Sequence, residues 1–254
     1  MGRNASMHLI LGNGNLGRSL ANQLAQRGLS YKLLDKSEFC YPKNELVVPG
    51  GTRYLWNTIG AGSVEFAKNN PQATVDAHVS LPLYLCKTLP PGVRLILFSS
   101  DYAEKVPRSI YAVSKIAMEQ AVGLLGRPKT SIVRVGSLYG PYFPHKTFPG
   151  KIRARYKNAD HATFPQNLVR PTPTEWLADH LIKTVNTLFG IGVRPVIKDV
   201  CPRDQVSVAD WARVVLPNMK IYESGYDTER PVSSFLTHPP FVEDWLTLWE
   251  RHKI

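Results

Sequence analysis

A serine pair, a tyrosine and a lysine have the types and the spacing needed to move a proton to a carbonyl oxygen. Ser99 and Ser100 follow an apolar run, and Tyr111 and Lys115 stand four residues apart in a predicted helix. Residues four apart share one helix face, so the ammonium is expected near the phenol, where it favours the ionised form. Such tuning predicts Tyr111 as a general acid, with Ser100 holding the same oxygen.

A second set of residues is suited to binding phosphate. Gly12, Gly14 and Gly17 have the spacing G-x-G-x-x-G directly after the apolar run 8–11. The first glycine permits a tight turn, the second lets backbone approach a pyrophosphate, and the third lets helix pack on strand. A helix expected to open at Arg18 would turn its N–H groups and positive dipole end toward the anion. The pattern predicts a dinucleotide site, to which Asn15, Leu16 and Asn57 are also assigned, together with Tyr111 and Lys115.

The second strand, Tyr31–Leu34, ends at two residues that bear on which dinucleotide binds. Asp35 lies about 20 residues after the glycines, where a carboxylate accepts the ribose 2′-hydroxyl of NAD. Lys36 follows at once and could instead pair with the 2′-phosphate of NADP. The predicted cofactor is therefore NADP or NAD.

The elements that must position these groups alternate between strand and helix. Further strands are predicted within 47–58, centred on 54–56, and at 93–98 and 131–135, with helices at 64–70, 72–89 and 109–125. The run 93–98 is almost continuously apolar, as in a sheet buried on both faces. This rhythm predicts an α/β fold with a Rossmann-type, doubly wound parallel sheet. In the helix 72–89, Pro82 predicts a kink, and the expected buried stripe is Val75, Val79, Leu83 and Cys86.

Residues 1–140 are thus predicted to form a dinucleotide-binding Rossmann domain, and residues 141–254 a smaller substrate-binding lobe. Six prolines between 141 and 173 interrupt the second part. Helices are expected at 174–189 and 208–216, residues 193–200 are expected to return to the sheet, and the chain closes on an aromatic helix.

Composition narrows the functional classes. Hydrophobic content of 43% and charged content of 20% are ordinary for a globular protein. The three cysteines lack metal-ligand spacing, so neither a metal site nor a disulfide framework is predicted. No apolar run is long enough to span a membrane, and no signal peptide is visible before the first strand. We therefore expect a cytoplasmic protein without a membrane partner.

The chain is strongly basic, with 31 basic against 20 acidic residues and a net charge of +11. Basic residues concentrate at Lys146, Lys151, Arg153, Arg155 and Lys157, followed by Arg170. They predict either a solvated helix face or a clamp for a diphosphate, in which case Arg153, Arg155 and Arg170 are the candidate substrate ligands. Nothing has the pattern of a nucleic-acid recognition motif, so nucleic acid is not the expected partner.

Several motifs in one order resemble the extended branch of the short-chain dehydrogenase/reductase superfamily, and more narrowly the dTDP-4-dehydrorhamnose reductases and their sugar-nucleotide relatives. The segment 98–102 (Phe-Ser-Ser-Asp-Tyr) is similar to their S-T-D-Y motif, and Tyr111 and Lys115 match their catalytic pair. Weaker similarities are the segments 133–141, Pro171-Thr172 before Leu177-Ala178, and Arg230-Pro231 before Ser234 and Leu236. The resemblance implies an NAD(P)-dependent reductase or epimerase of a keto sugar nucleotide, with Ser100, Tyr111 and Lys115 catalytic, and is compatible with a homodimer.

Two departures from that family support a competing hypothesis. Only 11 positions separate Ser100 from Tyr111, about a dozen fewer than the family has, and Asp76 stands where the extended branch carries an asparagine that supports the lysine. Asp76 would either restrain Lys115 through a salt bridge or indicate an altered site. The alternative function is a non-catalytic dinucleotide-binding protein with a regulatory or structural role.

Overall fold

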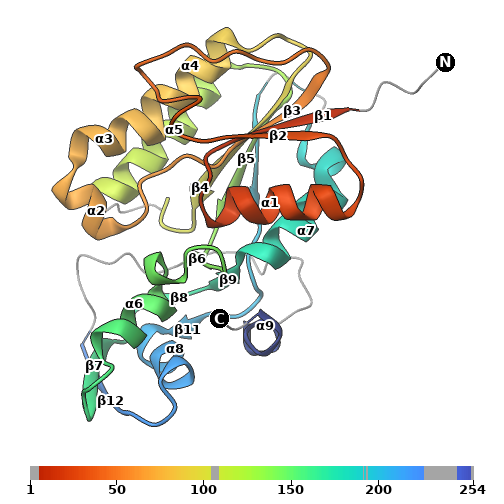
Figure 1. Ribbon diagram of the computed structural model, residues 1–254. Coiled ribbons are helices and arrows are strands. Elements are labelled where there is room, and N and C mark those ends of the chain that lie inside the picture. The colour runs from red at the N-terminus through yellow and green to blue at the C-terminus, as the bar shows by residue number, and fades with distance from the viewer. Residues whose placement is uncertain (1–5, 104–108, 191, 193, 226–244, 253–254) are drawn as a thin grey trace.

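The computed structural model describes residues 6–103, 109–190, 192, 194–225 and 245–252. These residues form a layered α/β part around a parallel sheet, with a smaller lobe below it in Figure 1. The Rossmann-type, doubly wound sheet predicted from the sequence is confirmed.

The central sheet of the described residues has six strands in the order β2-β1-β3-β4-β5-β10. Every neighbouring pair is parallel. The expected return of the chain to the sheet after residue 193 occurs as β10, which pairs with β5. The strands are β1 (Met7–Leu11), β2 (Tyr31–Leu34), β3 (Thr52–Asn57), β4 (Arg94–Ser100), β5 (Thr130–Val135) and β10 (Val196–Asp199).

β1 lies between β2 and β3, so the strand order reverses there. Residues 35–51 cross from β2 to β3 through turns and irregular backbone, and their Phe39 is buried against the sheet. In open α/β sheets, ligands bind at the carboxyl ends of the strands on either side of such a reversal. This rule places the expected ligand site where β1 ends at Leu11 and β3 ends at Asn57.

Alternate strand residues supply two cores, one on each face of the sheet. Ile10 and Ile96 pack with helices α1 (Asn15–Gln26) and α7 (Thr174–Thr184). Leu9 and Leu95 pack on the other face with helices α4 (Leu81–Thr88) and α5 (Ile110–Leu125). This alternation follows from the two-residue period of a strand and explains the continuous apolar runs.

Helix α1 begins three residues earlier than expected. Gly14 is its N-cap and Arg18 N donates to the Gly14 carbonyl over 3.0 Å, so Gly17 lies inside the first turn. The expected stripe of Leu16, Leu20 and Leu24 is buried as predicted.

The helix predicted over 72–89 is divided by a π-helical turn. Helix α2 (Val64–Asn69) leads to α3 (Pro71–Val75), then a π-helical turn at Asp76–Ser80, then α4. The predicted stripe is wrong at its start: Val75 is 39% exposed, while Thr74, just before the turn, and His78, within it, are buried. Pro82 lies just after this turn, where the α-helical hydrogen bonds are already interrupted.

The lobe has its own core, which contains Tyr139, Phe164 and Trp211. The predicted helix 174–189 is α7 followed by a 3₁₀ turn at Val185–Leu188. The aromatic closing helix is α9 (Trp245–His252). The other lobe elements are β6 (Ser137–Tyr139), a 3₁₀ turn (Pro144–Lys146), α6 (Phe148–Arg155), β7 (His161–Pro165), β8 (Leu168–Val169), β9 (Pro171–Pro173), β11 (Val206–Ser207), α8 (Val208–Val215) and β12 (Lys220–Ser224).

Candidate active site

The glycine turn after β1 has the backbone that its sequence predicts. Gly12 has φ +103°, a conformation that side chains disfavour. A Cβ on Gly17 would lie 1.9 Å from the Gly12 carbonyl oxygen, so only glycine lets the helix approach the turn this closely. A Cβ on Gly14 would meet nothing within 4 Å. The Thr58 hydroxyl lies 2.8 Å from the Leu11 carbonyl oxygen and 2.9 Å from that of Gly12, and it donates to them from the end of β3.

The amino end of α1 is open to an anion. No side chain caps it, and its first turn contains no acidic residue. The N–H groups of the first turn of a helix have no partner within the helix, and the dipole makes this end positive. Together with the open space over Gly14, these features fit a pyrophosphate.

Asn15 ties this turn to the start of the lobe. Its Nδ2 donates to the Phe143 carbonyl over 3.2 Å, and its Oδ1 accepts from Phe143 N over 2.8 Å. The Arg18 guanidinium lies 5.1 Å from the centre of the Phe143 ring and the Lys146 ammonium 4.7 Å from it. The side chain of Leu16 is buried in the core, and Asn57 Oδ1 accepts from Ile59 N over 3.3 Å. A cofactor contact from Asn15, Leu16 or Asn57 therefore remains a prediction.

Asp35 and Lys36 stand at the carboxyl end of β2, as predicted. Asp35 Oδ1 accepts from both the backbone N (2.8 Å) and the hydroxyl (2.7 Å) of Ser37. These two hydrogen bonds lower the pKa of Asp35 and keep it ionised. Lys36 is exposed.

Ser100, Tyr111 and Lys115 come together at the carboxyl end of β4. Ser100 is the last residue of β4, and its side chain is hydrogen-bonded to that of Tyr111 in the first turn of α5. Ser100 Oγ also donates to Asp101 Oδ1 over 3.0 Å. Lys115 Nζ donates to the Phe98 carbonyl over 2.8 Å and lies 5.9 Å from the centre of the Tyr111 ring.

The electrostatics of this group correct one expectation. Burial, reinforced by the negative charge of Asp101, raises the pKa of Tyr111 to about 12, although the hydrogen bond between Tyr111 and Ser100 acts in the opposite direction. Tyr111 is therefore a neutral phenol at pH 7, and Lys115 does not drive its ionisation as expected. Burial also lowers the pKa of Lys115 to about 8, against the raising effect of Glu119.

Behind Lys115, one turn further along α5, lies an ion pair between a buried glutamate and a half-buried arginine. Glu119 is 8% exposed, and its two carboxylate oxygens accept from Nε (2.9 Å) and Nη2 (2.6 Å) of Arg134 on β5. A bidentate pair of this kind fixes both side chains in one geometry. It anchors the part of α5 that carries Lys115 to the sheet.

The predicted partner of Lys115 lies elsewhere. Asp76 Oδ1 accepts from Gln72 Nε2 over 3.0 Å, and the described residues contain no salt bridge between Asp76 and Lys115. Two positions later, His78 is 1% exposed and its ring stands edge-on to that of Tyr111, with 5.1 Å between ring centres. The sequence analysis missed this histidine, because the polar residues Thr74 and His78, rather than the apolar Val75, face the interior here.

The three candidate diphosphate ligands have different surroundings. Arg153 and Arg155 lie exposed on α6. Arg170 is 4% exposed, and its Nη1 donates to the carbonyl groups of Pro202, over 2.8 Å, and Arg203. Backbone carbonyls hold the guanidinium of Arg170, which favours a structural role for it, whereas Arg153 and Arg155 are accessible.

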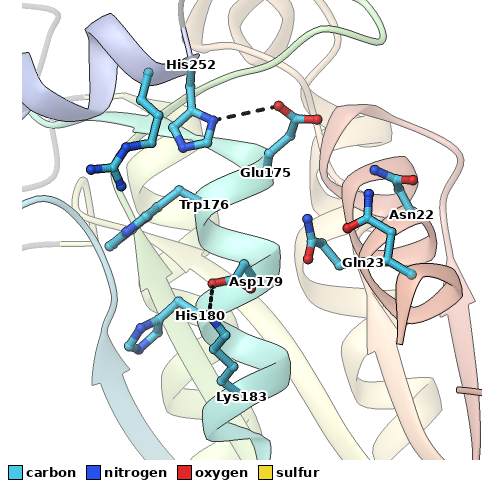
Figure 2. Close-up of a pocket in the computed structure, with 10 residues that line it drawn as sticks. Asn22, Gln23, Glu175, Trp176, Asp179, His180, Lys183 and His252 are labelled. Carbon is cyan, nitrogen blue, oxygen red and sulfur yellow. Dashed lines mark ion pairs between the residues drawn. The ribbon is translucent and has the colours of Figure 1, made fainter. Parts of the chain in front are cut away.

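A groove of about 520 Å³ lies away from this site, between α1, α7 and α9. Figure 2 shows Asn22 and Gln23 of α1 facing α7, and an ion pair joins His252 to Glu175. None of the predicted site residues lines it. Within the described ranges, no helix is both long and apolar enough for a membrane span, and no three His, Cys, Asp or Glu side chains gather as a metal site.

The chain matches the family model described as the RmlD substrate binding domain over residues 93–236, more than half of its length. The segment Arg230–Leu236 noted in the sequence falls in this match but outside the described residues. No sequence among the curated proteins matches the chain.

Solved structures extend the similarity over almost the whole chain. A dTDP-4-dehydrorhamnose reductase from Clostridium acetobutylicum superposes with a TM-score of 0.80 at 20% identity, covering 97% of this chain and 98% of its own. The dTDP-4-dehydrorhamnose reductase of Bacillus anthracis, in complex with NADP, gives 0.78 at 21% with the same coverage. The UDP-glucose 4-epimerase of Thermus thermophilus, in complex with NAD, gives 0.61 at 18%, covering 91% of each chain. At these identities the likeness establishes the fold.

Proposed function

We propose that this chain, which belongs to the RmlD substrate binding domain family, is an NAD(P)-dependent reductase of a keto sugar nucleotide. The observation that carries the proposal is the convergence of Ser100, Tyr111 and Lys115 at the carboxyl end of β4, on the same sheet edge as the glycine turn. The similar reductase and epimerase structures that hold NADP or NAD support the choice of cofactor. On the sequence arguments above, we place the protein in the cytoplasm; the family resemblance is compatible with a homodimer.

The residues that would hold the dinucleotide are those of the glycine turn and the carboxyl end of β2. The N–H groups at the open amino end of α1, next to Gly14, would donate to the pyrophosphate, and Asp35 or Lys36 would contact the adenosine ribose. A bound reduced nicotinamide supplies a hydride for the carbonyl carbon of the substrate.

Tyr111 supplies the proton. Its raised pKa keeps the phenol protonated until negative charge develops on the carbonyl oxygen, which suits a general acid that donates during reduction. Ser100 Oγ, already hydrogen-bonded to Tyr111, is positioned to hold the same oxygen. Lys115, whose pKa of about 8 lies near neutrality, stands beside the phenol and would return a proton to it after transfer.

Arg153 and Arg155 are the proposed ligands of the diphosphate in the substrate. Both lie exposed in the last turn of α6, on the lobe. Guanidinium groups suit phosphate because they form bidentate, charge-assisted hydrogen bonds. We assign no substrate contact to Arg170, because backbone carbonyls hold its guanidinium.

The test is Tyr111→Phe, assayed against a panel of 4-keto sugar nucleotides with NADH and NADPH. Removing the hydroxyl deletes the acid and leaves the ring contacts in place, so turnover should fall by about 10²-fold or more while dinucleotide affinity is unchanged. Wild-type protein that binds a dinucleotide but converts no member of the panel would overturn the proposal. That result would favour the non-catalytic dinucleotide-binding alternative.

A further inference from the structure

His78 occupies a buried position between the turn that follows β3 and the helix that carries Tyr111. Its Nε2 accepts from Ala61 N over 2.9 Å, and its Nδ1 lies 2.8 Å from Ser114 Oγ. Ser114 Oγ in turn donates to the backbone carbonyl of Tyr111 over 2.8 Å. His78 therefore contacts Tyr111 in two ways: its ring packs edge-on against the Tyr111 ring, and the Ser114 hydroxyl links it to the Tyr111 backbone.

These hydrogen bonds define the protonation of the imidazole. Because Nε2 accepts an N–H from Ala61, it carries no proton. The proton of the neutral ring is therefore on Nδ1, which donates to Ser114 Oγ, and the Ser114 hydroxyl has its own proton free for the Tyr111 carbonyl. A second proton on the ring would break the contact with Ala61, and burial together with the nearby Lys115 charge disfavours it.

The segment at the other end of these hydrogen bonds, residues 58–61, contacts the glycine turn of the proposed dinucleotide site. Thr58, at its start, donates to the carbonyl groups of Leu11 and Gly12. Gly60 approaches the histidine so closely that a Cβ there would lie 3.3 Å from His78 Nε2. The same short segment thus contacts the glycine turn at one end and His78 at the other.

We propose that His78 is a positioning residue that sets Tyr111 relative to the bound dinucleotide, by joining residues 58–61 to α5 through Ser114. The inference rests on the proposed function for its kinetic consequences, whereas its geometric consequences can be measured without turnover.

Two substitutions separate the two ends of the bridge. His78→Asn keeps a donor near the Nδ1 position for Ser114 but is too short for Ala61. His78→Gln keeps an acceptor for Ala61 but loses the donor to Ser114, and Ser114→Ala breaks the same link from the other side. His8→Gln is the matched control, because His8 is also buried and accepts from Trp56 Nε1 over 3.1 Å, near the amino end of β1 and away from the site.

The experiment measures three quantities for each variant: the ¹⁹F line of 3-fluorotyrosine at position 111, the Kd for NADH and NADPH, and kcat on any keto sugar nucleotide that the wild type reduces. His78→Gln and Ser114→Ala should add a second ¹⁹F environment and lower kcat about tenfold to 100-fold, since small misplacements of a reacting group have effects on this scale. Their Kd should stay within twofold of the wild type. His78→Asn should instead weaken dinucleotide binding and keep one ¹⁹F line.

A merely structural histidine would behave differently. The proposal is overturned if the His78 variants only lose thermal stability, as His8→Gln should, while the ¹⁹F line, Kd and kcat keep their wild-type values. It is also overturned if His78→Asn and His78→Gln change all three quantities alike. If the wild type reduces no substrate, the proposed function fails, and the ¹⁹F line and Kd still decide the role of His78.

Discussion

Gly14→Val separates binding of a dinucleotide from folding, because position 14 is open in the folded chain. The backbone there has φ −89° and ψ −170°, which a β-branched residue adopts readily. The new Cβ meets no atom within 4 Å. Loss of the glycine N-cap costs about 0.5–1 kcal/mol, so the Tm of the free protein should fall by no more than about 3 °C.

The effect on the ligand-bound protein should be far larger. A ligand at 100 times its Kd stabilises the folded state by about 2.7 kcal/mol. For a chain of this size that is a rise in Tm of about 5–10 °C. The valine side chain occupies the space that a pyrophosphate would take, so the rise should fall to about 1 °C or less in the variant. Differential scanning fluorimetry with and without saturating NADH or NADPH measures both quantities.

Gly17→Ala is the contrasting variant. Its Cβ would lie 1.9 Å from the Gly12 carbonyl oxygen, so the helix or the turn must move. It should lower the Tm of the free protein markedly, because overpacking against backbone costs about 1–3 kcal/mol or more. The reasoning is refuted if Gly14→Val retains the full ligand-induced rise, or if the wild type shows none.

Three further outcomes are expected from the structure. Asp35→Ala should weaken NADH binding and Lys36→Ala NADPH binding, each by about tenfold as a lost charge-assisted contact, and equal effects on both dinucleotides would contradict the assignment. Burial lowers the pKa of His8 to about 4 and that of His78 to about 2, below the 6.5 of a histidine in the unfolded chain. Neither group affects stability above pH 6.5, but below that pH the unfolded chain binds protons that the folded chain does not. Urea unfolding should therefore show the free energy of unfolding falling by up to about 1.4 kcal/mol per pH unit for each histidine, with the His8 contribution complete near pH 4. Glu119→Gln removes one charge of a pair in which the Arg134 side chain is 29% exposed, so it should cost about 1–3 kcal/mol in urea unfolding, whereas the exposed Glu65→Gln should cost under about 1 kcal/mol.

The strands and the glycine turn could be predicted because their signals are local. Apolar runs such as 93–98 predict buried parallel strands directly, and the three glycines have backbone roles that only glycine fills. The proposed catalytic pair of Tyr111 and Lys115 could be placed together as well, because a tyrosine and a lysine four apart must share a helix face. Local patterns thus predict the type of each element and which residues share one of its faces.

Local sequence patterns could not predict features that depend on contacts between residues distant in the chain. The buried face of this segment runs through the polar residues Thr74 and His78 and leaves Val75 exposed, so a search for apolar positions does not find it. The pKa of Tyr111 rises because burial and Asp101 outweigh its other neighbours, which a four-residue spacing does not reveal. The pairing of Asn15 with Phe143, 128 positions apart, has no sequence signal at all.

The return of the chain to the sheet means that the proposed dinucleotide site and the lobe cannot be separated as independent fragments. Helix α7 covers the face of the sheet that Ile10 and Ile96 supply, and β10 completes the edge beside β5. A fragment ending at residue 140 would lose both, and with them the partner of the Asn15 amide at Phe143. The first half of the chain therefore depends on the second for its fold. An insertion or a truncation in the lobe should accordingly lower the affinity of the proposed site for a dinucleotide.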